Sequence, residues 1–155
     1  MLYKNEECEL YVDITPTLID KIKEESLKFN PLETGGLLFG EYQDDCAIIR
    51  DIFTPNKMVH RTHGCEWEPS KETQKVIDAK WDKGQYIIGD WHSHPDNSPE
   101  PSEIDDDQLF KDANNKKLNC PEPILLIMGG NPDMGWNMSL HLYIKDKKYP
   151  LTHVY

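Results

Sequence analysis

The feature that most constrains the fold of this 155-residue chain is a pair of histidines, one residue apart, at the end of a hydrophobic segment. Residues 89–95 read Gly-Asp-Trp-His-Ser-His-Pro, and an aromatic and β-branched run from Gln85 to Ile88 precedes them. This pattern predicts a buried strand that ends at the proline. Alternate side chains of a strand leave the same face, so His92 and His94 can reach one metal ion while Ser93 points away.

The sequence beyond this strand offers a third metal ligand. Asp105 lies just inside a helix that we expect to begin at Pro101-Ser102 and to continue through Phe110. Two imidazoles and one carboxylate leave the fourth position of a tetrahedral zinc ion open for water, as in catalytic sites. Alternatively, Ser102-x-x-Asp105 is a helix N-cap that needs no chemistry. At average residue frequencies, however, the full spacing His-x-His-x7-Ser-x2-Asp should arise by chance in roughly one such chain in several thousand.

A carboxylate also stands immediately before a glycine-rich apolar segment. Residues 33–40 read Glu-Thr-Gly-Gly-Leu-Leu-Phe-Gly, and glycines in a strand permit a close backbone approach. Taken alone, Glu33 is a solvated residue at the start of a strand. Beside a metal site, it is the expected base for the metal-activated water. The residues therefore indicate a metal-dependent hydrolase.

Together these segments resemble the JAMM motif of the MPN/JAB-domain metalloproteases. The resemblance extends from about Leu10 to Tyr143. It implies that Zn2+ is the cofactor and assigns five residues: the metal ligands His92, His94 and Asp105, the general base Glu33, and Ser102, which stabilises the tetrahedral intermediate.

The resemblance also implies a substrate class. Members of this family cleave the isopeptide bond between the C-terminal glycine of ubiquitin, or of a ubiquitin-like modifier, and a lysine. A short chain with this histidine motif is most similar to bacterial JAB-type proteins that accompany E1-like and E2-like conjugating proteins in antiphage operons of the CBASS type. The expected partners are therefore a ubiquitin-like modifier or its conjugate with a target, together with E1-like and E2-like proteins.

Three other functions compete with this one. A JAB-type peptidase that trims a sulfur-carrier or modifier precursor would use the same residues and cannot be separated by sequence. A non-catalytic MPN-like binding module would tolerate the loss of a ligand or of the base, and neither is missing. A zinc nucleobase deaminase needs His-x-Glu and a later Pro-Cys-x-x-Cys, and the chain contains neither.

Length and composition indicate the number of domains and exclude some classes of partner. A length of 155 residues is typical of one domain, so we expect residues 1–155 to form a single MPN/JAB-like domain. A net charge of -11 argues against nucleic-acid binding, because phosphate contacts depend on clustered Lys and Arg. No apolar run reaches membrane-spanning length, and the N-terminus lacks the apolar core of a signal peptide, so we expect a cytoplasmic protein without membrane contact.

Four cysteines show no paired spacing, which argues against disulfides, and we expect mostly buried, reduced thiols. The spacing His60-x-x-His63-x-Cys65 is a possible second metal cluster, but it lies in a stretch expected to be irregular, which favours incidental histidines. Acidic residues surround the expected site, either as a solvated helix start or as a rim that attracts a basic partner. These are Asp96, Glu100, Glu103, Asp106 and Asp107.

The remaining segments predict a scaffold of strands interspersed with helices. Thr15-Pro16 should begin one helix and Ser70 should cap another that ends near Gly84. We expect substrate-shaping loops at Pro55 to Pro69 and at Pro95 to Pro101, with Trp67 and Trp91 either lining the groove or buried in the core. The expected strands are residues 8–14, the segment after Glu33, residues 46–53, 124–128 and 139–144, and a last strand at 151–155. The expected fold class is α/β, a mixed central β-sheet flanked by helices.

Overall fold

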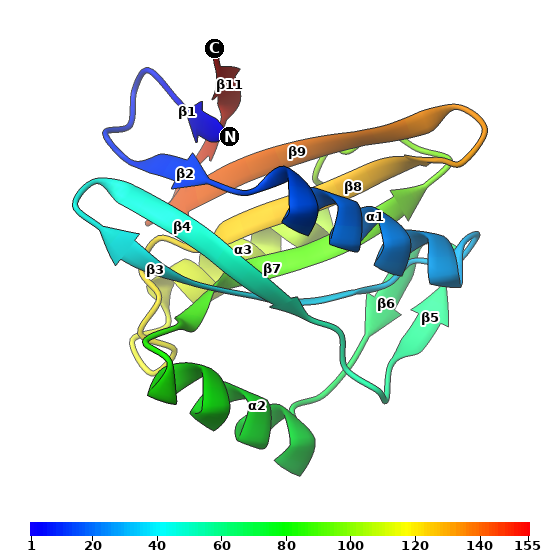
Figure 1. Cartoon of the computed structure of the whole chain (residues 1–155), viewed down its shortest axis with the longest axis horizontal. Helices are drawn as coiled ribbons and strands as arrows, with labels where there is room; N and C mark the ends of the chain where they lie inside the picture. Colours follow the sequence, from blue (N-terminus) through cyan, green and yellow to red (C-terminus); the bar gives the residue numbers. More distant parts are fainter.

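The computed structural model describes the whole chain, Met1 to Tyr155, as three helices around one large sheet (Figure 1). In chain order the elements are β1 (Leu2–Lys4), β2 (Tyr11–Asp13), α1 (Pro16–Phe29), β3 (Gly35–Gln43), β4 (Cys46–Phe53), β5 (Val59–Arg61), β6 (Gly64–Glu66), α2 (Lys71–Asp82), β7 (Tyr86–Pro95), α3 (Glu103–Asn114), β8 (Ile124–Asn131), β9 (Gly135–Ile144), β10 (Lys147–Pro150) and β11 (Thr152–Val154).

Nine strands form a mixed sheet in the order β10-β9-β8-β7-β3-β4-β2-β1-β11. The pairs β2–β4 and β7–β8 are parallel and the other neighbours are antiparallel. In Figure 1, α1 crosses one face of the sheet, α3 lies behind it and α2 lies beside the start of β7. The expected mixed sheet flanked by helices is confirmed.

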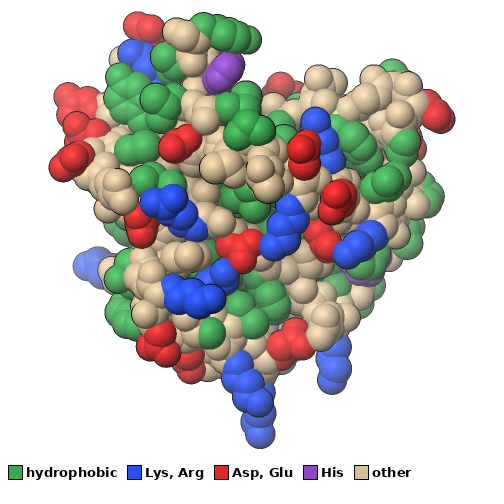
Figure 2. All heavy atoms as spheres, viewed as in Figure 1, with side chains coloured by type: hydrophobic (Ala, Val, Ile, Leu, Met, Phe, Trp, Pro, Cys, Tyr) green, Lys and Arg blue, Asp and Glu red, His purple; other side chains and the backbone are tan.

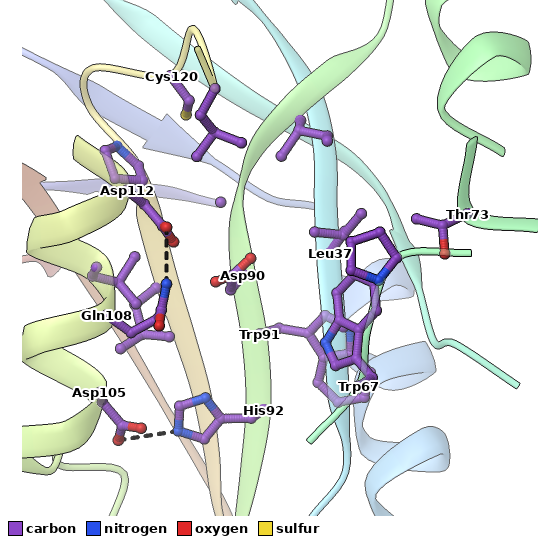
Figure 3. Close-up of a pocket in the computed structure, with 18 of the residues that line it drawn as sticks. Leu37, Trp67, Thr73, Asp90, Trp91, His92, Asp105, Gln108, Asp112 and Cys120 are labelled. Carbon is purple, nitrogen blue, oxygen red and sulfur yellow. Dashed lines mark hydrogen bonds and ion pairs between the residues drawn. The ribbon is translucent and has the colours of Figure 1, made fainter. Parts of the chain in front are cut away.

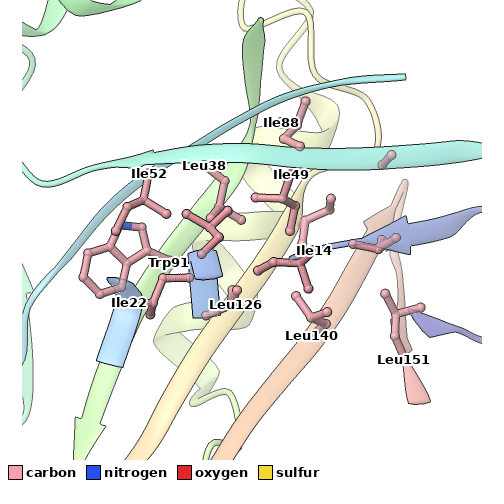
Figure 4. Packing of buried hydrophobic residues seen from close by; sticks show 14 of the residues in the cluster. Ile14, Ile22, Leu38, Ile49, Ile52, Ile88, Trp91, Leu126, Leu140 and Leu151 are labelled. Carbon is pink, nitrogen blue, oxygen red and sulfur yellow. The ribbon is translucent and has the colours of Figure 1, made fainter. Parts of the chain in front are cut away.

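Strand β8 shows why the centre of the sheet is hydrophobic on both faces. Leu126 and Met128 belong to the larger core cluster, which includes Ile22 of α1 (Figure 4). Leu125 and Ile127 face the other way and form a smaller cluster with Leu109 of α3 and Tyr143. Because successive side chains point to opposite faces and both faces are covered, the strand reads as a continuous apolar run.

Local signals place the helices and the first hairpin well. Thr15 Oγ1 accepts a hydrogen bond from the Leu18 amide, and Pro16 occupies the first turn of α1. Ser70 caps α2 through a capping box with Thr73. The strands expected after Glu33 and at residues 46–53 are confirmed, and they pair as the antiparallel hairpin β3–β4.

The structure corrects several boundaries. Residues 8–14 contain only the three-residue β2, and β1 was not expected, because it pairs with β11 from the opposite end of the chain. The loop at 55–69 contains the antiparallel hairpin β5–β6, so the stretch around His60 is not irregular. The structure adds residues 135–138 to the start of β9, where they pair with the end of β8, and it adds β10. Exposed glycine and polar residues interrupt both segments, so neither stands out as an apolar run.

Other expectations are corrected in part. All four cysteines are free, but only Cys120 is buried, while the other three are half-buried. Trp91 is buried in the core, and Trp67 is half-buried. Figure 2 shows Lys and Arg side chains interspersed with Asp and Glu on the face that α1 covers. None of the three helices combines the length and apolar character needed to cross a membrane.

Candidate metal centre

The two histidines of β7 lie on one face, at the end of the strand. The Nε2 atoms of His92 and His94 are 3.0 Å apart, and both side chains are largely buried. The intervening Ser93 is fully buried on the opposite face. The alternation expected from the sequence therefore directs both imidazoles to a single point.

Asp105 completes this cluster from α3. Its Oδ2 atom lies 3.2 Å from Nε2 of His92 and 3.5 Å from Nε2 of His94. The same oxygen accepts a hydrogen bond from the Ser102 amide, while Ser102 Oγ accepts one from the Asp105 amide. The capping box is thus present as well, and it fixes the carboxylate toward the histidines.

Ser102 itself lies at the edge of the cluster. It is exposed and lines the same cavity of about 420 Å³ as the histidines and Asp105. Its hydroxyl accepts the capping hydrogen bond, which leaves its proton available to donate into the cavity.

Glu33 approaches the histidines from the segment before β3. One carboxylate oxygen of Glu33 and one nitrogen from each of His92 and His94 lie within 4.8 Å of one another. Burial raises the pKa of Glu33, and the neighbouring His92 and His94 oppose that rise. The structure therefore brings all five sequence-predicted site residues to one cavity.

Two strands meet closely to place Glu33. The Ser93 amide donates to the Thr34 carbonyl at 2.9 Å, and Ser93 Oγ accepts from the Thr34 amide at 3.0 Å. A Cβ at Gly35 would lie 2.4 Å from the Trp91 carbonyl oxygen and 2.9 Å from Cβ of His92. Only glycine allows β3 to lie this close to β7, the strand that carries His92 and His94.

The hairpin β5–β6 holds Glu33 from the other side. The Glu33 amide donates to the Arg61 carbonyl at 2.8 Å, and Nδ1 of His60 lies 2.8 Å from the Glu33 carbonyl oxygen. The His60 ring also stacks on Phe29, with ring centroids 4.1 Å apart. Sequence reasoning missed this role of His60, because nothing in the local pattern shows that the hairpin folds back onto Glu33.

His60, His63 and Cys65 do not form a second metal cluster. Metal-capable side chains converge at the cluster of Glu33, His92, His94 and Asp105, which does not include these three residues. His63 and Cys65 instead line the metal cavity.

The electrostatics of the cluster fit a cation. Burial alone would raise the pKa of Asp105, but hydrogen bonds from His92 and His94 outweigh it and hold that pKa well below its usual range. Burial alone would lower the pKa of His94, yet Asp105 and the Ser98 carbonyl keep it above its usual value. The site therefore favours a negative carboxylate beside positive charge.

The contacts of His94 also suit a metal ligand. Nδ1 of His94 lies 3.1 Å from the Ser98 carbonyl oxygen. If this nitrogen carries the proton, Nε2 presents a lone pair to His92 and to Asp105, as in metal-binding histidines oriented by a backbone carbonyl. Lone pairs this close repel unless a proton or a cation lies between them. Two imidazoles with carboxylates are a donor set that suits a divalent transition metal.

A larger cavity adjoins the metal cavity. It has a volume of about 750 Å³ and shares four lining residues with the smaller one, namely Cys65, His92, Ile104 and Asp105 (Figure 3). The expected acidic rim is only partly free. Asp106 accepts hydrogen bonds from Tyr143 and Lys148, and Asp96 accepts one from Asn131.

Two solved structures resemble this fold. The solution structure of protein DSY2949 from Desulfitobacterium hafniense superposes with a TM-score of 0.67 at 18% sequence identity, covering 90% of this chain and 88% of that one. The solution structure of a protein from Salinibacter ruber gives a TM-score of 0.58 at 16% identity, covering 88% and 86%. At these identities the likeness concerns the fold alone.

Sequence comparison gives a closer relationship. A CD-NTase/cGAS isopeptidase from Enterobacter hormaechei is 30% identical over 81% of this chain and 71% of its own length. A probable metalloprotease, y4qB, from Sinorhizobium fredii is 27% identical over 77% and 76%. A CD-NTase/cGAS isopeptidase from Escherichia coli is 28% identical over 68% and 67%. The family model described as prokaryotic homologs of the JAB domain matches residues 15–141, and the chain belongs to that family.

Proposed function

We propose that this protein is a zinc-dependent isopeptidase that cleaves after the C-terminal glycine of a ubiquitin-like modifier and releases it from a lysine. The observation that carries this proposal is the convergence of Glu33, His92, His94 and Asp105 on one cavity. Family membership and the relatives named isopeptidase and probable metalloprotease support peptidase chemistry.

Three of these residues would hold the zinc. His92, His94 and Asp105 supply two nitrogens and one oxygen, and the capping box with Ser102 orients the carboxylate. When bound, zinc supplies Lewis-acid chemistry that makes a water more acidic and polarises the scissile carbonyl.

Glu33 would move the proton. Its carboxylate takes a proton from the attacking water as the water oxygen bonds to the carbonyl carbon. The C–N bond then breaks, and Glu33 returns the proton to the departing lysine amine. A raised pKa, caused by burial, suits a group that must accept and then release a proton near neutral pH.

Ser102 would stabilise the intermediate between these two steps. Its hydroxyl lines the metal cavity and would donate a hydrogen bond to the developing oxyanion. This donor is already oriented, because the serine is fixed as the N-cap of α3.

The names of two relatives suggest which conjugates to test. Because they are called CD-NTase/cGAS isopeptidases, we extend the proposal to conjugates of a CD-NTase-like enzyme, in an antiphage system with E1-like and E2-like proteins.

The first test combines metal content with cleavage for two variants. We expect about one zinc per chain in the wild type and in Glu33→Gln, but loss of zinc in His92→Ala, because His92 is a proposed zinc ligand and Glu33 is not. Cleavage of a conjugate joined through a terminal glycine should be lost in both variants. Metal content is measured by mass spectrometry and cleavage by gel shift.

The substrates and the wild type provide the controls. A linear fusion and an isopeptide-linked conjugate, compared side by side, separate precursor trimming from deconjugation. Equal activity of Glu33→Gln and wild type would remove Glu33 from the mechanism. A folded, zinc-supplied wild type that binds no zinc and cleaves neither substrate would instead indicate a binding module.

A further inference from the structure

The larger cavity beside the metal centre has one acidic wall. Helix α3 presents Asp105, Gln108, Leu109 and Asp112 to it, a spacing that places these side chains on one helical face. Seven residues of helix span about 10 Å, so the cavity extends that far from the metal cluster toward Asp112.

Strand β7 supplies a further carboxylate to the same cavity. Asp90 is two residues before His92, so both side chains leave the same face, with Cα atoms about 7 Å apart. In Figure 3, Asp90 lies between α3, which carries Asp112, and β3, which carries Leu37. Its carboxylate has no hydrogen bond and no ion pair anywhere in the structure, and the half-buried side chain lines the cavity.

No positive side chain pairs with Asp90 or Asp112, whereas Glu66 pairs with Arg61 at 3.1 Å and Asp105 contacts His92. The residues that line the cavity include Glu66, Asp90, Asp105 and Asp112, but no lysine and no arginine. Asp112 has only the Gln108 amide as its side-chain partner, at 3.0 Å. A carboxylate without a partner, partly removed from water, is stabilised by a nearby cation, and without one it tends to take up a proton.

The carboxylates of this cavity do not form a second metal site. Asp90, Asp112 and the buried Cys120 line one end of the cavity, yet their ligand atoms do not converge within 4.8 Å as those of Glu33, His92 and His94 do. A long, flexible side chain with a terminal charge does not need such convergence. Apolar surface from Leu37, Trp67 and Ile77 would contact its methylene groups.

Resting on the proposed function, we propose that this cavity is a specificity subsite that binds a lysine or arginine side chain of the substrate, with Asp90 and Asp112 as its carboxylate partners. An extended peptide advances about 3.3 Å per residue, so a cavity about 10 Å long places this basic residue within about four residues of the scissile bond. The volume of about 750 Å³ lies in the range of ligand pockets.

Binding tests the subsite independently of catalysis. The probes are fluorescent glycine-terminated peptides in which one position is lysine or norleucine, which has a similar length and no charge, scanned over the last six positions. With the inactive Glu33→Gln protein, anisotropy should show at least tenfold tighter binding of lysine at one position. Adding Asp90→Asn or Asp112→Asn should reduce that ratio toward one. Asp20→Asn, an exposed position of α1 outside both cavities, should leave it unchanged.

The outcomes separate the two proposals. Equal binding of lysine and norleucine peptides at every position, or a preference that survives Asp90→Asn and Asp112→Asn together in folded protein, would overturn the subsite. Cleavage of the same peptides, linked to lysine, by Glu33-containing protein reports on the proposed function. A lysine preference in binding without any cleavage would therefore keep the subsite and reject the isopeptidase.

Discussion

Ser102 has two roles that a single substitution can separate. It caps α3 and lines the metal cavity. We expect Ser102→Ala to lower the free energy of unfolding by about 1 kcal/mol, from the lost cap. It should also reduce kcat roughly 100-fold, because an oxyanion donor is removed. Denaturant unfolding and steady-state kinetics measure the two effects.

Thr15 provides the matched control. It caps α1 in the same way and lines neither cavity. Thr15→Ala should therefore lose comparable stability and keep its kcat. A kcat for Ser102→Ala that falls no further than that of Thr15→Ala would show that Ser102 only caps the helix.

At the scale of elements, the hairpin β5–β6 determines where Glu33 lies. Nδ1 of His60 contacts the Glu33 carbonyl oxygen, and the Arg61 carbonyl accepts a hydrogen bond from the Glu33 amide. We expect His60→Ala to lower kcat about tenfold, the equivalent of one hydrogen bond, with unchanged zinc content, since His60 is not a ligand. His60→Asn, which keeps a donor at a similar position, should recover part of that loss.

A neighbouring position on the same strand controls for the integrity of the hairpin. Val59 is about half exposed on β5, so Val59→Ala should leave kcat near the wild-type value. If both substitutions lowered kcat equally, the effect would belong to the hairpin as a whole and His60 would have no special role.

Across the whole molecule, Asp51 of β4 joins two helices. Its carboxylate forms ion pairs with Lys21 of α1 at 2.7 Å and with Lys80 of α2 at 2.6 Å. Burial alone would raise the pKa of Asp51, but hydrogen bonds from the two lysines outweigh it and hold that pKa below its usual value. A carboxylate with a lowered pKa in the folded state stabilises the fold above its unfolded pKa, and that contribution is lost as the pH falls through the folded value.

Asp51→Asn should therefore remove roughly 1 kcal/mol of stability at pH 7, the scale of partly exposed ion pairs. The difference from wild type should shrink as the pH falls below about 4. Urea unfolding at several pH values measures it. A difference that stays constant from pH 7 to pH 2.5 would show that packing, and not charge, accounts for the loss.

Much of the fold was visible in the sequence for local reasons. The caps at Thr15, Ser70 and Ser102 depend on residues three apart, and the histidine strand depends on alternation within one segment. The elements that were missed depend on distant partners: β1 pairs with β11, and β5–β6 packs against the segment before β3.

The sequence by itself determined the chemistry of this protein. It supplied two imidazoles on one strand face, a carboxylate three residues after a capping serine, and a glutamate before glycines that allow close contact. Only the tertiary structure decided how these groups meet. Gly35 brings β3 against His92, His60 anchors Glu33, and the path from Asp105 to Asp112 faces Asp90 across an acidic cavity. The physical reason is that such contacts join residues far apart in the chain, where no local pattern records which side chains become neighbours.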